Sequence, residues 1–209
     1  MIVKSRWLLM ALALMVCGTI QAAEDPKPEA PAAGLAVGES LPAFESTDEQ
    51  GLPWKSADHV GKKVLVLYFY PGDFTGGCIK QAEAYREGLA KLEELGVELV
   101  GVSGDEAATH KLFKETYGLK HALLADPEGK LAKLVGVPVS AGGRVSPTTP
   151  DRKPIPDADG KRSVFERPVT IARWTLVVDK DGKIASLRNI VDPVTDSEDV
   201  RKIVEALPR

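Results

Sequence analysis

The sequence is poor in several residue types on which particular protein classes depend. Two cysteines among 209 residues are too few for a disulfide-stapled scaffold or a cysteine-rich zinc site. Aromatic residues make up 6% and the net charge is −3, which argues against base-stacking surfaces and against nucleic acid as a partner. The 3 histidines are scattered, so no metal site is expected. Hydrophobic residues at 44% and charged residues at 27% indicate an ordinary globular protein.

The first 22 residues have the organisation of a secretory signal peptide. Lys4 and Arg6 precede an uninterrupted apolar run from Trp7 to Cys17, and small residues follow as far as Ala22. The apolar run is short, because a membrane span needs about 20 apolar residues. We predict that residues 1–22 are cleaved and that the protein is exported to the periplasm, with no stable membrane span after cleavage. A retained membrane anchor is the alternative.

Cleavage at this point removes Cys17 and leaves Cys78 as the single cysteine of the exported chain. Residues 23–36 are rich in Pro, Ala and Glu, which predicts a flexible spacer before the folded part. Thiols tend to be oxidised outside the cytoplasm. An unpaired cysteine there indicates either a reactive thiol or an intermolecular disulfide.

Hydrophobic periodicity from residue 37 onward predicts strands that alternate with helices. The strand patterns lie at 63–70, 97–103, 121–125, 174–178 and 183–189, and the helical patterns at 76–95, 107–117, 130–135 and 197–207. This alternation predicts one α/β domain, residues 37–209, with a partly parallel sheet. The stretch 138–170 holds six prolines and little periodicity. We predict that it is an inserted surface loop beside the functional site.

Cys78 stands where the first long strand gives way to the first long helix. With Thr75 as the N-cap, Cys78 occupies the first helical turn, where free backbone N–H groups and the helix dipole favour an anion. A thiolate is such an anion, and cysteines placed in this way are often nucleophilic at neutral pH. Placement alone leaves open a buried, inert cysteine.

The spacing Pro71-x-x-x-Thr75-x-x-Cys78 resembles the active-site signature of the peroxiredoxins. Further blocks resemble the bacterioferritin comigratory protein (Q-type) subfamily in the same order along the chain: Gly101–Asp105, His110, Phe113, Tyr117–Leu119, Leu123–Gly129, Gly136–Val137 and Ala172–Asp179. The resemblance implies a thioredoxin-like α/β fold with a central mixed sheet flanked by helices. It also implies a thiol-dependent peroxidase that acts on hydrogen peroxide and organic hydroperoxides in antioxidant defence, without a bound cofactor.

The resemblance further implies a role for each of four residues. Cys78 is the peroxidatic cysteine, whose thiolate attacks the peroxide and becomes a sulfenic acid. Thr75 hydrogen-bonds the peroxide, and Pro71 shields the sulfur from solvent. Arg173 lies near the thiolate, which it stabilises, and polarises the O–O bond.

The sequence departs from the subfamily pattern at the position of the second cysteine. Members with an internal partner commonly carry it five residues after the first cysteine, where this chain has Glu83. We therefore predict a one-cysteine mechanism that needs an external reductant, either a thioredoxin-like or glutaredoxin-like protein or a small thiol. Gly76 and Gln81 also replace a proline and a carboxylate that are common in the subfamily.

The missing second cysteine keeps another class of function open. In it, the chain is a thioredoxin-fold redox sensor or binding protein that forms mixed disulfides through Cys78. Turnover with a donor thiol distinguishes the enzyme from the sensor. The sequence leaves both a monomer and a homodimer open.

Overall fold

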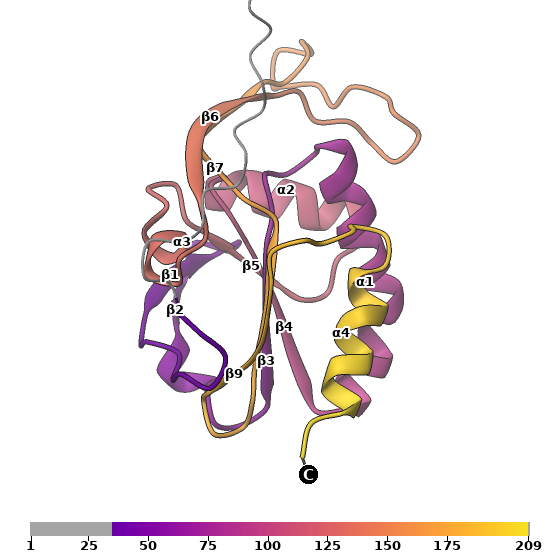
Figure 1. Cartoon of the computed structure of the whole chain (residues 1–209). Coiled ribbons are helices and arrows are strands. Elements are labelled where there is room, and N and C mark those ends of the chain that lie inside the picture. The colour runs from indigo at the N-terminus through magenta and orange to yellow at the C-terminus, as the bar shows by residue number, and fades with distance from the viewer. Residues whose placement is uncertain (1–34, 209) are drawn as a thin grey trace, which may run out of the picture.

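The structure is a computed structural model that describes residues 35–208. The predicted signal peptide and most of the predicted spacer lie outside the described residues. Figure 1 shows the elements, whose bounds follow in chain order: β1 Glu45–Asp48, β2 Pro53–Lys55, the 3-10 helix η1 Ser56–Asp58, β3 Val64–Phe69, α1 Gly76–Glu94, β4 Val97–Ser103, α2 Ala107–Tyr117, β5 Ala122–Ala125, α3 Lys130–Leu134, β6 Val139–Val145, β7 Phe165–Ile171, β8 Trp174–Val178, β9 Ile184–Arg188 and α4 Asp196–Glu205.

A seven-stranded mixed sheet forms the centre of the molecule, in the order β2-β1-β5-β4-β3-β8-β9. The central strands β3, β4 and β5 are parallel, whereas β8 and β9 extend the sheet in antiparallel fashion. Helices α1 and α4 pack against each other on one side (Figure 1). The mixed sheet flanked by helices confirms the predicted α/β fold class.

The central strand β3 is buried on both faces, as its continuous apolar run predicts. Leu65, Leu67 and Phe69 join the core that contains α3, while Val66 and Tyr68 join the core that contains α1 and α4. This alternation follows from the two-residue period of a strand. Packing on both faces holds β3 in place. The loop that follows β3 leads into α1, the helix that contains Cys78.

The predicted elements from residue 63 onward agree with the structure to within one or two residues, except in the proline-rich stretch. There β6 and β7 form a two-stranded antiparallel hairpin, with Val139 opposite Ile171 and Val145 opposite Phe165. The prediction of a surface loop over 138–170 was therefore wrong at both ends, where the chain forms strands. Each strand depends on a partner 20 or more residues away, so local periodicity did not reveal it. The elements β1, β2 and η1 were also not predicted.

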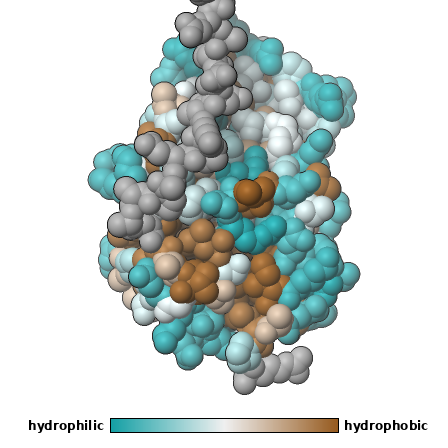
Figure 2. Space-filling view, viewed as in Figure 1, coloured by the Kyte–Doolittle hydropathy of each residue, from teal (hydrophilic) through white to brown (hydrophobic). Residues whose placement is uncertain are grey.

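The described surface exposes few large apolar side chains, namely Val37, Leu52, Leu134, Val164, Ile190 and Val194. In the view of Figure 1, hydrophilic residues cover most of the surface, and apolar residues gather on the lower half, over the part of the sheet that includes β9 (Figure 2). Within residues 35–208, every helix is too short or too polar to cross a membrane.

Candidate active site

The loop between β3 and α1 places Cys78 at the carboxyl end of the parallel strands. Phe74 adopts a left-handed backbone conformation, with φ of 57°, and Thr75 returns to an extended one at the N-cap. The Thr75 hydroxyl donates to the carbonyl oxygen of Gly72 at 2.9 Å rather than accepting from the helix. Thr75 is thus the N-cap by position, as predicted, while its side chain closes the loop.

Cys78 lies in the first turn of α1 and is 1% exposed. Its side chain belongs to a buried cluster that includes Tyr68, Tyr70 and Tyr85. The Nη2 atom of Arg173 donates to its sulfur at 3.2 Å. A guanidinium stays charged at any physiological pH and offers several N–H donors in a fixed planar geometry.

The pairing of β8 with β3 brings Arg173 to Cys78. Phe69, the last residue of β3, lies opposite Trp174, the first residue of β8. Arg173 precedes that pair and therefore stands beyond the end of β3, beside the loop that leads to α1. The structure thus brings together two of the residues singled out by the sequence, Cys78 and Arg173. Pro71 is half-buried at the start of the same loop.

A buried polar network orients Arg173. Its Nη1 donates to Oε1 of Gln81, and Nε2 of Gln81 donates to Asp196 at 2.8 Å. Asp196 also accepts hydrogen bonds from Tyr85 at 2.7 Å and Thr175 at 2.8 Å. Because Arg173 contacts both Gln81 and Cys78, its guanidinium is held in one orientation. The sequence singled out Gln81 only as a departure and did not reveal Asp196.

Arg188 balances the charge of the buried Asp196 carboxylate, donating to it at 2.6 Å. The side chain of Asp196 is fully buried, so this partner matters for the stability of the carboxylate. The network therefore joins α1, β8, β9 and α4 behind the sulfur.

A second buried network lies behind the loop. The Asp73 carboxylate accepts from the Tyr70 hydroxyl at 2.8 Å and contacts Nδ1 of His110 at the same distance, while Asp105 accepts from the Asp73 backbone N–H. Burial and the charge of Asp73 raise the pKa of Asp105 to about 6. Burial on its own lowers the pKa of His110, but the charge and hydrogen bond of Asp73 outweigh it, so the pKa is raised.

The second network explains residues whose role the sequence left open. His110 ties α2 to the loop through its contact with Asp73. Asp73 and Asp105 lie within the motif blocks that carry the resemblance, but nothing in their spacing showed that they meet. Within residues 35–208, no group of three or more metal-ligating side chains comes together.

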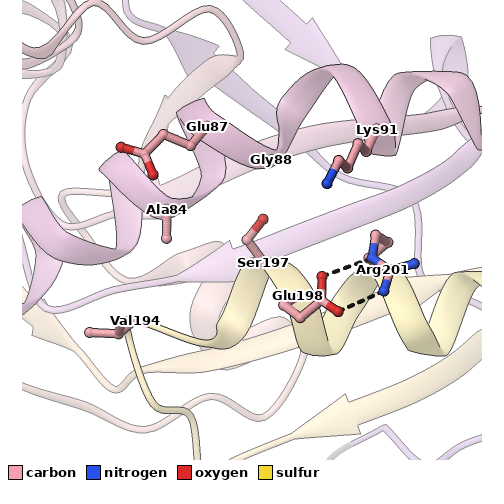
Figure 3. Close-up of a pocket in the computed structure, with 8 residues that line it drawn as sticks. All are labelled: Ala84, Glu87, Gly88, Lys91, Val194, Ser197, Glu198 and Arg201. Atoms are coloured by element: carbon pink, nitrogen blue, oxygen red, sulfur yellow. Dashed lines mark hydrogen bonds and ion pairs between the residues drawn. The ribbon is translucent and has the colours of Figure 1, made fainter.

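A groove between α1 and α4 lies away from this chemistry (Figure 3). Glu87, Lys91, Glu198 and Arg201 line it with balanced charge, and Glu198 pairs with Arg201 at 2.6 Å. A Cβ atom built on Gly88 would lie 2.2 Å from Oγ of Ser197, so glycine permits the close approach of the two helices. Cys78 and Arg173 are not among the residues that line this groove.

The family model of the AhpC/TSA family matches residues 37–187, which is most of the described chain. The chain belongs to the AhpC/TSA family. This membership and the relatives below confirm the resemblance to the peroxiredoxins and to their Q-type subfamily.

Relatives of the chain within the AhpC/TSA family carry the name peroxiredoxin Q. Chloroplastic peroxiredoxin Q of Suaeda salsa is 42% identical over 106 residues, which cover 51% of this chain and 49% of that protein. The Arabidopsis thaliana protein of the same name is 45% identical over 101 residues, which cover 48% and 46%. The chain thus matches about half the length of these relatives.

A solved structure with a similar fold is peroxidoxin BcpB from Mycobacterium tuberculosis. It superposes with a TM-score of 0.66 and covers 84% of this chain and 99% of the other, at 23% identity. This similarity supports the thioredoxin-like fold that the resemblance implied.

Proposed function

We propose that this chain is a thiol-dependent peroxidase that reduces hydrogen peroxide and small organic hydroperoxides through Cys78. The observation that carries the proposal is the Arg173 guanidinium, 3.2 Å from a buried sulfur in the first turn of a helix. Family membership and the peroxiredoxin Q names of the relatives support it.

The chemistry proposed for Cys78 is a two-electron oxidation of sulfur. The thiolate attacks one peroxide oxygen, an S–O bond forms and the O–O bond breaks, and the second oxygen leaves with a proton as water or an alcohol. Arg173 donates to the oxygen that gains charge, at the point where a fixed cation stabilises the transition state. Gln81 keeps the guanidinium in that direction.

Thr75 and Pro71 are proposed to shape the space above the sulfur. The Thr75 hydroxyl lies in the loop that precedes Cys78 and already donates to Gly72, so its oxygen remains free to accept a hydrogen bond from a peroxide. Pro71 lacks a backbone N–H and limits the conformations of this loop. Both residues thereby favour one orientation of a small substrate.

The sulfenic acid is proposed to be reduced by an external thiol. Cys78 is the free cysteine of residues 35–208, and Glu83 occupies the position of the second cysteine. A donor thiol condenses with the sulfenic acid to give a mixed disulfide and water, and a second thiol then releases Cys78 and a donor disulfide. Thioredoxin-like proteins, glutaredoxin-like proteins and small thiols all supply this chemistry. We further propose export to the periplasm after cleavage of residues 1–22.

A single-turnover experiment tests the proposed function. The full chain carrying Cys17→Ser, so that Cys78 is its only thiol, is mixed with one equivalent of hydrogen peroxide. The sulfenic acid is trapped and weighed by mass spectrometry. We expect a rate orders of magnitude above that of free cysteine, and none in the additional Cys78→Ser variant. A rate like that of free cysteine would contradict the peroxidase.

The alternative function, a redox sensor or binding protein that forms mixed disulfides through Cys78, predicts a different second step. After oxidation, a donor thiol is added in excess, and peroxide consumption is followed over many cycles. Sustained turnover supports the enzyme. A stable Cys78 mixed disulfide with negligible turnover supports the sensor.

A further inference from the structure

The β6–β7 hairpin packs directly on the loops that follow β3 and β4. A Cβ atom built on Gly72 would lie 2.0 Å from Nη1 of Arg167, and one built on Gly104 would lie 2.1 Å from the carbonyl oxygen of Val169. Both separations are far below a normal non-bonded contact. Glycine at these two positions therefore allows the hairpin to dock beside the candidate active site.

Arg167 of β7 is buried at this junction, with a side chain that is 10% exposed. Its Nε and Nη2 atoms donate to Oγ1 of Thr170 at 3.4 and 3.3 Å. Its Nη1 faces Oδ1 of Asp105 at 4.0 Å, and neither atom has a hydrogen-bond partner among the described residues. A buried cation is tolerated only beside an opposite charge, which Asp105 supplies here.

The other carboxylate oxygen of Asp105 holds the loop that leads to Cys78. Oδ2 accepts from the Asp73 backbone N–H at 2.8 Å and from the Ser103 hydroxyl at 2.7 Å. The neighbouring carbonyl of Gly72 accepts from Thr75. Arg167 thus acts on this loop in two ways, by packing against Gly72 and by facing the carboxylate that holds Asp73.

We propose that Arg167 is a positioning residue for the reaction at Cys78, acting from the inserted hairpin through Gly72 and Asp105 on the loop Gly72–Thr75. This inference rests on the proposed peroxidase function and extends it to a residue outside the motif. A displaced loop misplaces the Thr75 side chain and the first turn of α1 relative to Arg173. Because peroxide reduction requires several groups in register, a small displacement slows it more than it slows a reaction that needs only the sulfur.

The test compares Arg167→Met with a matched control, Arg144→Met, in the full chain carrying Cys17→Ser. Arg144 lies on the paired strand β6, is exposed, and forms a surface ion pair with Glu166. Two rates at Cys78 are measured for each variant, one with hydrogen peroxide and one with iodoacetamide. We expect Arg167→Met to lower the ratio of the peroxide rate to the iodoacetamide rate at least 10-fold, and Arg144→Met to leave it unchanged.

Amide hydrogen exchange gives a readout that does not depend on activity. The Asp73 amide, which donates to Asp105, should exchange at least 10-fold faster in Arg167→Met, while the Gly182 amide, which donates to Asp179 in a distant turn, should not change. Arg167→Lys keeps the charge but not the planar fork, and we expect partial rescue of both readouts. If Arg167→Met does not fold, as judged by circular dichroism, Arg167→Lys takes its place. The rate ratio and the Asp73 amide exchange of Arg167→Lys are then compared with those of the parent, and no change in either would overturn the positioning role.

The outcomes separate this inference from the proposed function. A starting protein that reacts with peroxide no faster than free cysteine overturns both. A fast reaction with an unchanged rate ratio in Arg167→Met overturns the positioning role alone. Equal losses in the two rates also overturn it, because they mean that the substitution acts on the sulfur in general.

Discussion

Arg173 donates to the sulfur of Cys78 at 3.2 Å, although the two residues are 95 positions apart in the chain. The contact needs the antiparallel pairing of β8 with β3, which places Arg173 beyond the end of β3. It also needs Gln81, one turn after Cys78 on α1, to hold the other side of the guanidinium.

Arg173→Met should slow the reaction of Cys78 with hydrogen peroxide. Loss of one fixed donor to a developing negative charge typically costs about 10²–10³ in rate. Arg173→Lys should recover only part of the rate, because an ammonium group cannot reach both Cys78 and Gln81 in the same geometry. Stopped-flow measurement of single turnover checks both variants. A full rate in Arg173→Met would remove this residue from the mechanism.

Gln81→Met tests how much of the effect of Arg173 depends on the orientation of its guanidinium, because the variant keeps the charge but removes the hydrogen bond that orients it. The substitution keeps the approximate volume but removes the acceptor for Arg173 and the donor to Asp196. We expect a smaller loss of peroxide rate than in Arg173→Met, since the charge remains but its orientation is less fixed. The same single-turnover assay measures it, and a loss as large as that of Arg173→Met would mean that orientation is the entire effect.

Asp196→Asn should destabilise the fold. The carboxylate accepts from Gln81, Tyr85 and Thr175 and pairs with Arg188, and its side chain is fully buried. Removing one partner of a buried ion pair costs about 3–5 kcal/mol. Urea unfolding measures the change in free energy.

Asp199→Asn is the matched control for that prediction. Asp199 pairs with the same Arg188 at 2.7 Å but is only partly buried, with a side chain that is 33% exposed. The expected cost is therefore smaller, about 0–1 kcal/mol. Equal costs for the two variants would contradict the central position given to Asp196.

The free energy of unfolding should depend on pH partly because of His121. Burial and the charge of Lys114 lower the pKa of His121 to about 3 in the folded state, against 6.5 unfolded. The unfolded chain therefore binds the proton more readily between these values. The contribution of His121 to the free energy of unfolding is fully present above pH 6.5. It is lost as the pH falls towards 3, at up to about 1.4 kcal/mol per pH unit.

His121→Phe removes this titration and also removes the hydrogen-bond partner of the Tyr68 hydroxyl, which lies 2.7 Å from Nε2. The variant should be less stable than the parent at pH 7, by about 1–3 kcal/mol for the unpaired hydroxyl. The difference should shrink as the pH falls from 6.5 to 4. Urea unfolding across this range checks it, and a constant difference would contradict the lowered pKa.

The form that the proposed cleavage would leave, residues 23–209, should contain no intrachain disulfide after oxidation by one equivalent of peroxide. Cys78 is its single cysteine. Non-reducing mass spectrometry should instead find a sulfenic acid, or a mixed disulfide once a donor thiol is added. Protein recovered after export with an intrachain disulfide would show that Cys17 is retained and that residues 1–22 are not cleaved.

Local sequence determined much of the fold and the position of Cys78 in it. The continuous apolar run of β3, the periodicity of α1 and the Thr75 N-cap all depend on residues close in the chain, so their pattern predicted them correctly. The same local order places Cys78 in the first turn of α1, where the helix favours an anion. Resemblance to a family, not the pattern itself, singled out Arg173.

Tertiary structure alone decided which distant groups meet at the sulfur. Asp196 lies 115 residues from Gln81, and the β6–β7 hairpin carries Arg167 to the loop at Gly72 and Asp105. These contacts depend on strand register and on close approach at glycine, which no local pattern records. The sequence therefore specified a cysteine in the first turn of a helix, whereas the packing of strands and helices around it supplied the charges and hydrogen bonds that orient its partners.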